Sequence, residues 1–229
     1  MYRRSILAAS LFACLTLASS AFGAFIPLAG TVELLPSDTV VPGMVSATDF
    51  GTLLAFRDEG YSFSTTAGTT SGVVRSAVYR NPNGTLDFWY QVSNDSSSAT
   101  EIARETNTNF AGYQTWVGFM FDGGALPGLT WGMGTKQPIT ADANNDQSVI
   151  GFSFRPPDAT AKIKPGETSA ALVISTDAVY YTLGNAAVID GGTQTVDAFQ
   201  PAIPGPATWV LGATGLLGIL ASRRWKRNS

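Results

Sequence analysis

Residues 72–92 carry the strongest structural signal in the chain, an alternation of side chains with a period of two. Large apolar residues occupy every second position from Leu86 to Val92, and a similar run covers residues 73–79. Between the two runs lies Asn-Pro-Asn-Gly at positions 81–84, a set of residues that favours tight turns. The pattern therefore predicts a β-hairpin with a four-residue loop.

Other short apolar runs, separated by turn residues, extend this pattern along the chain. They cover residues 50–56, 61–65, 115–121, 149–154, 170–175 and 186–189. Pro165-Gly166 predicts a type II turn that joins two strands. Short strands without long helical periods predict an all-β fold, with a two-sheet β-sandwich as the body. The absence of an exact repeat argues against a propeller or solenoid.

The chemistry open to the chain is narrow, because the sequence contains no histidine and a single cysteine. Without histidine it lacks the usual triad base and the commonest zinc ligand. Its one cysteine, Cys14, lies in the apolar N-terminal segment, so a domain that begins after this segment has neither a disulfide nor a thiolate nucleophile. We expect no enzymatic activity and no cofactor.

The charge distribution excludes one class of partner. Between residues 24 and 206 there are 8 basic and 17 acidic residues, a net charge of −9. Nucleic-acid binding needs clustered lysine and arginine to neutralise phosphates. We therefore expect no nucleic-acid partner.

The N-terminal 23 residues have the order of a secretory signal peptide. A basic start at residues 1–4 precedes an apolar run at residues 6–18 and the small-residue segment Ala-Phe-Gly at positions 21–23. This predicts cleavage by signal peptidase between Gly23 and Ala24. The alternative of a retained N-terminal anchor is disfavoured, because the apolar run ends too early for a span of about 20 residues.

The C-terminal segment has the order of a membrane anchor. Residues 207–222 carry no charge, and the basic residues that follow them are Arg223, Arg224, Lys226 and Arg227. Because such cations stay in the cytoplasm, this order predicts a single transmembrane helix with the body of the protein outside. At 1.5 Å per residue the helix would be about 24 Å long, which is short for a hydrocarbon core of about 30 Å.

This tail resembles the PEP-CTERM sorting signal of bacterial exported proteins, through Pro204-Gly205-Pro206, the apolar segment and the basic end. In that family a Pro-Glu-Pro motif precedes one membrane helix, and an exosortase in the inner membrane recognises the signal; here Gly205 replaces the glutamate. The β-rich ectodomains of the family resemble the body, through the strand at residues 86–94 and the turn at residues 165–169.

The resemblance implies that the protein is exported and held for a time in the inner membrane. It then reaches the cell surface, the outer membrane or an extracellular matrix of exopolysaccharide. The expected division is a signal peptide (1–23), an exported domain (24–198), a Pro-rich linker with the motif (199–206), a transmembrane helix (207–222) and a basic cytoplasmic tail (223–229). The expected role of the domain is structural or interactive.

Two binding sites remain as alternatives. An aromatic platform could stack against sugar rings, which would make the body a carbohydrate-binding module on the same anchor. Its candidate residues are Trp89 and Trp116, with Trp131, Tyr90 and Tyr113. Asp142, Asn144 and Asp146 resemble the start of a calcium loop. Because the later glycine and glutamate of such a loop are missing, a solvated turn is the preferred interpretation and no metal site is expected.

Paired carboxylates are the remaining enzymatic option. Asp58 with Glu59, Glu101 with Glu105, or Asp122 could supply an acid and a nucleophile. No motif surrounds any of them, so exposed surface carboxylates are the preferred interpretation.

Overall fold

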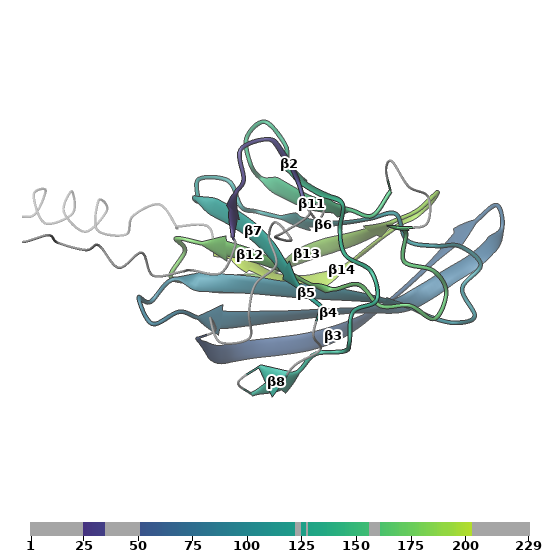
Figure 1. Cartoon of the computed structure of the whole chain (residues 1–229), viewed down its shortest axis with the longest axis horizontal. Coiled ribbons are helices and arrows are strands. Elements are labelled where there is room, and N and C mark those ends of the chain that lie inside the picture. Colours follow the sequence, from purple (N-terminus) through teal and green to yellow (C-terminus); the bar gives the residue numbers. More distant parts are fainter. Residues whose placement is uncertain (1–24, 35–50, 122–124, 127, 156–160, 203–229) are drawn as a thin grey trace, which may run out of the picture.

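The structure, a computed structural model, describes residues 25–34, 51–121, 125–126, 128–155 and 161–202. These residues form two six-stranded antiparallel sheets that pack face to face (Figure 1). The expected all-β class is therefore confirmed. No helix long and apolar enough to span a membrane occurs among the described residues.

The strands of each sheet come from distant parts of the chain. The first sheet contains, in spatial order, β1 (Ile26–Pro27), β7 (Thr115–Met120), β12 (Ala171–Thr176), β5 (Leu86–Asn94), β4 (Gly68–Arg80) and β3 (Thr52–Thr65). The second sheet contains β14 (Thr193–Pro201), β13 (Tyr181–Ile189), β6 (Arg104–Thr108), β11 (Val149–Ser153), β10 (Thr140–Ala143) and β2 (Thr31–Glu33). A separate ribbon pairs β8 (Ala125–Leu126) with β9 (Leu129–Thr130).

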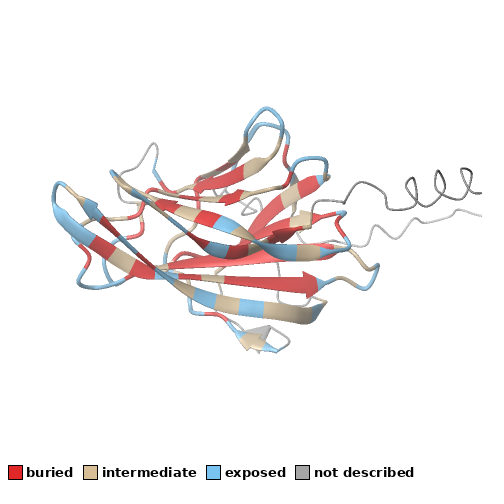
Figure 2. Cartoon of the chain, turned by 180° about the vertical axis from the view of Figure 1, so that it is seen from behind, coloured by how far each residue is buried: buried red, intermediate tan, exposed pale blue. Residues whose placement is uncertain are grey.

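Both sheets contribute to one apolar core between them. Alternate residues of β5, including Phe88 and Tyr90, point into this core from the first sheet, and Ile150, Phe152 and Val188 enter it from the second. Figure 2 shows buried residues along strands of both sheets. The core follows from the period-two pattern, because alternate residues of a strand share a face.

At one side the two sheets share the N-terminal segment. β1 pairs with β7 in the first sheet, and β2 pairs with β10 in the second. Gly30 lies between the two short strands with a φ of +82°, a left-handed conformation that glycine adopts without strain. Because both edge strands are short, each sheet exposes few unpaired backbone groups there.

At the other side β3 and β14, the edge strands of the two sheets, contact each other. The Arg57 side chain pairs with Glu59 on its own strand and lies 3.4 Å from Asp197 of β14. The turn before β14 also packs here, because Gly192 lies against the ring of Phe63. The C-terminal hairpin therefore closes this side of the molecule.

The predicted hairpin and turn are both present. β4 and β5 pair from Gly72↔Asn94 to Arg80↔Leu86, so the loop has five residues, one more than predicted. At the second turn Gly166 has a φ of +83°, and the Glu167 amide donates to the Lys164 carbonyl at 2.9 Å. Single bridges flank this turn, and the strand predicted after it is present as β12.

Several strands lie outside the predicted runs. β6, β10 and β14 were missed, and the runs at residues 50–56 and 61–65 belong to one continuous strand, β3. β6 gives no apolar alternation because its buried positions are Glu105 and Asn107. A strand whose core positions are polar shows no apolar alternation in the sequence.

The boundary expected at residue 198 is wrong by at least three residues, because β14 continues to Pro201. The Ala202 amide donates to the Tyr180 carbonyl at 3.0 Å, and the Tyr113 hydroxyl donates to the Ala202 carbonyl. Residues 199–201 therefore belong to the body and not to the linker. The signal peptide with its cleavage site, the Pro-Gly-Pro motif, the apolar segment and the basic tail lie outside the described residues.

We expect the Phe152→Ala variant to lose about 3–5 kcal/mol of unfolding free energy, because it leaves a cavity in the core. Phe152 is 0 % exposed, whereas Phe56 is 52 % exposed on β3. The control Phe56→Ala should cost about 1 kcal/mol or less. Urea denaturation of residues 24–202 measures both, and equal losses would contradict the assigned core.

Candidate functional site

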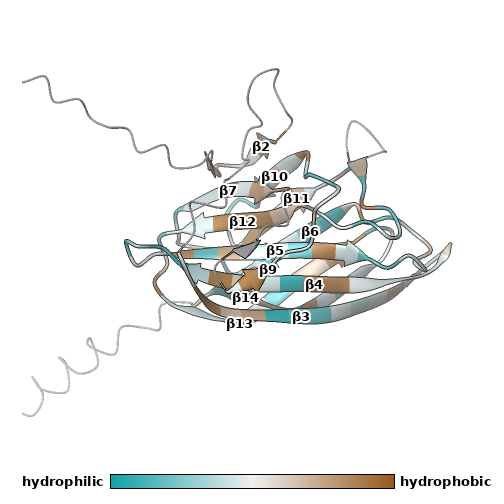
Figure 3. Cartoon of the chain, turned by 60° about the horizontal axis from the view of Figure 1, so that its bottom comes forward, coloured by the Kyte–Doolittle hydropathy of each residue, from teal (hydrophilic) through white to brown (hydrophobic). Residues whose placement is uncertain are grey.

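Residues 128–136, here called the outer segment, cross the face of the first sheet that is turned away from the second sheet. Figure 3 shows β9 of this segment over β4 and β5. Trp131 is the apolar anchor of the segment. It packs in a second apolar cluster whose other buried members are Ala77, Tyr79, Trp89, Met120, Ala171 and Val173.

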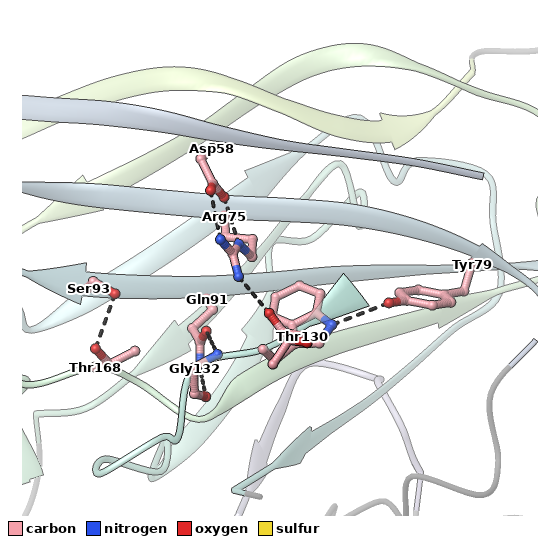
Figure 4. A network of polar contacts seen from close by, with 9 residues as sticks. Asp58, Arg75, Tyr79, Gln91, Ser93, Thr130, Gly132 and Thr168 are labelled. Atoms are coloured by element: carbon pink, nitrogen blue, oxygen red, sulfur yellow. Dashed lines mark hydrogen bonds and ion pairs between the residues drawn. The ribbon is translucent and has the colours of Figure 1, made fainter. Parts of the chain in front are cut away.

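Polar side chains of the sheet bind the backbone of the outer segment (Figure 4). Arg75 Nη1 donates to the Thr130 carbonyl at 2.8 Å. The Gln91 amide makes two bonds to Gly132: its Nε2 donates to the carbonyl at 2.8 Å, and its Oε1 accepts from the amide at 3.1 Å. The segment is thus held in register by side chains that sequence analysis would place in solvent.

The exposure of the aromatic side chains beneath the segment tests the hypothesis that they bind sugar. Trp89 and Trp131 have ring centroids 5.9 Å apart, and Tyr79 lies 6.2 Å from Trp89. All three side chains are at most 1 % exposed. Trp89 therefore offers no surface to a sugar ring.

Trp116, a second tryptophan of the expected sugar platform, is partly exposed on β7. β12 lies between β7 and β5, so the strands of Trp116 and Trp89 are about 10 Å apart. The structure does not bring the two indoles together into one exposed face.

The Gly134→Ala variant should destabilise the outer segment. A Cβ at Gly134 would lie 2.5 Å from the Ala170 Cα, so the segment must shift at a cost of about 1–3 kcal/mol. Gly60→Ala is the matched control, because its Cβ would lie 3.9 Å from the nearest atom. Thermal unfolding and acrylamide quenching of tryptophan test this prediction; unchanged stability and quenching in Gly134→Ala would contradict the tight approach.

The residues of the calcium-loop hypothesis are engaged elsewhere. Both carboxylate oxygens of Asp142 accept bonds from the Arg104 guanidinium, at 2.6 and 2.8 Å. Asn144 Oδ1 accepts from the Val149 amide, and Asp146 Oδ1 accepts from the Ser148 amide. The bonds of Asn144 and Asp146 close the turn between β10 and β11, as expected for an Asn- and Asp-rich loop. The Asp142–Arg104 pair joins β10 to β6. Among the described residues no cluster of metal-binding side chains is present.

The paired carboxylates are separated by the strand geometry. Asp58 binds Arg75 at 2.7 Å, whereas Glu59 binds Arg57 toward the β14 side of the molecule. The hydrogen bond from Arg75 lowers the pKa of Asp58. Because successive side chains of a strand point to opposite faces, these two acids cannot act on one substrate atom. Asp122 lies outside the described residues.

Glu105 is the one acid whose environment differs most from the expectation of a surface carboxylate. It is 0 % exposed on β6, and Asn107 Nδ2 donates to its Oε2 at 2.9 Å. Its Oε1 accepts no hydrogen bond from the described residues. Burial raises the pKa of Glu105 to about 8. Burial also raises the pKa of Tyr90, and the charge of the nearby Glu105 raises it further. The polar sequence around Glu105 gives no signal of this burial.

The burial of the Glu105 carboxyl predicts that the free energy of unfolding falls as pH rises. The pKa of Glu105 is 4.5 in an exposed chain and about 8 when folded, so between these values the native state binds more protons. Unfolding free energy should therefore decrease from about pH 4.5 to about pH 8. Urea denaturation across this range should show a smaller decrease for Glu105→Gln.

The control for this experiment is Glu101→Gln, which removes a partly exposed carboxylate four positions before Glu105. An identical profile for wild type and Glu105→Gln would show that Glu105 is not protonated in the native state.

Comparison with known proteins finds no matching family model, no matching curated protein and no matching solved structure.

Proposed function

We propose that this protein is an exported bacterial protein with a β-sandwich body, sorted through a PEP-CTERM-like tail to the cell surface or an exopolysaccharide matrix. A signal peptide directs export, the helix at residues 207–222 holds the protein in the inner membrane, and an exosortase processes the tail. The body has a structural or interactive role and is not an enzyme.

The order of segments at the C-terminus carries this proposal. β14 ends at Pro201, and Pro204-Gly205-Pro206, the uncharged segment and the basic cluster follow at once. The prolines favour an extended backbone at the motif, and the cations fix the orientation of the helix. An extended segment just outside a short helix is accessible to a membrane-embedded processing enzyme.

Ion pairs engage several charged side chains of the body with one another. Asp58 binds Arg75, Asp142 binds Arg104, and Lys162 binds Asp190 at 2.9 Å. These pairs join different strands or loops. The carbohydrate-binding alternative loses support because two of its tryptophans, Trp89 and Trp131, pack against each other and are buried.

Deletion of the exosortase should cause the full-length protein to accumulate in the inner membrane. In wild-type cells the released form should lack residues 209–229, as measured by mass spectrometry of surface-located protein. Gly205→Glu restores the carboxylate of the family motif and should keep or raise the processing rate. Recovery of peptides that reach Arg223 from mature surface protein would refute the sorting proposal and leave a plain anchor.

A further inference from the structure

Three exposed apolar side chains gather where the chain leaves the body. Val179, Tyr180 and Leu183 are 49 %, 74 % and 51 % exposed, and we call them the exit patch. The Tyr180 carbonyl accepts from the Ala202 amide at 3.0 Å, and Leu183 pairs with Phe199 of β14. The patch therefore lies next to the last described residue.

The backbone at this end is fixed by its packing. The rings of Tyr181 and Phe199 meet edge to face with centroids 5.7 Å apart. The Tyr113 hydroxyl donates to the Ala202 carbonyl. The exit patch and the point of departure of the chain thus belong to one ordered unit.

The distance from this point to the apolar segment is limited by chain length. Five residue steps separate Ala202 from residue 207, and a fully extended chain spans at most about 18 Å over them. Insertion of residues 207–222 into a bilayer would hold the exit patch within that reach of the lipid surface. Such a tether gives even a weak contact a high effective concentration.

On the basis of the proposed function, we propose that the exit patch docks on the lipid bilayer that holds the tail. Tyrosine is enriched at membrane interfaces, where its ring meets apolar chains and its hydroxyl meets water. Valine and leucine beside it add apolar area that docking would remove from water. The body then stands on the membrane in one orientation, with its C-terminal end toward the lipid.

The chain segment that carries the patch has little charge, so we expect an apolar contact with the bilayer and not an electrostatic one. Residues 176–183 contain no lysine or arginine, and Asp177 is the one charged residue among them. The Asp177 carboxylate accepts a hydrogen bond from the backbone amide of Gln114 at 3.0 Å. Docking should therefore occur on neutral lipid and persist at high salt, because screening weakens charge attraction but not apolar contact.

The test uses the full chain after removal of the signal peptide, residues 24–229, in phosphatidylcholine vesicles with a polarity-sensitive fluorophore on one introduced cysteine, because this chain has no cysteine of its own. Val179→Cys places the label in the exit patch. Thr66→Cys places it in the β3–β4 turn, which lies at the opposite end of the body because Gly192 packs on Phe63. The nine-residue strand β13 separates the two ends by about 30 Å.

We expect the Val179 label to shift to shorter emission wavelength and to be quenched several-fold less by iodide than the Thr66 label. Adding Tyr180→Thr and Leu183→Thr should remove this protection, while flotation with the vesicles is unchanged. The matched control Phe56→Thr removes an equally exposed apolar side chain from β3 and should leave the protection intact.

Equal quenching of the two labels in protein that floats with vesicles would overturn docking and leave the anchor standing. Protection that rises with the protein-to-lipid ratio would also overturn it, in favour of contact between two copies of the chain. Failure of the full chain to float would refute the membrane anchor itself, and the docking proposal with it.

Discussion

The burial of β5 on both faces is the constraint on which the rest of the structure depends. From Leu86 to Val92 every residue of this strand is buried. One face is covered by the second sheet, as in any two-layer β fold, but the other needs a cover of its own. The outer segment supplies it, and its close approach at Gly134 and its bonds to Gln91 follow from that need.

How far the sequence predicts the fold depends on where polar residues lie. The β4–β5 hairpin is predictable because alternation and turn residues agree there. The cover over Trp89 is not, since Gln91 suggests a solvent-exposed face until its amide is seen to bind Gly132. β6 is hidden for a related reason, because Glu105 and Asn107 occupy the positions where an apolar pattern is sought.

The calcium-loop and sugar-platform hypotheses differ in whether they depend on local sequence or on strand order. At Asn144 and Asp146 the missing glycine and glutamate of a calcium loop favoured an ordinary turn, and both side chains bond to backbone amides of that turn. Local signals could not show that Trp89 and Trp116 lie apart, because that depends on β12 being inserted between their strands. Long-range strand order is set by the whole chain and leaves no trace in a window of a few residues.

The contact between β3 and β14 has a consequence for the order of events in biogenesis. Arg57 and Asp197 are 140 positions apart, so this side of the core stays open until nearly all of the body has been delivered. Contacts of such large sequence separation form slowly, because a long loop must close first. If export stalled before the last hairpin emerged, the fourteen-residue edge strand β3 would lack its contact with β14, and an uncovered edge strand is a template for aggregation. In the proposed export route, completion of folding would thus coincide with arrival of the C-terminal segment at the membrane.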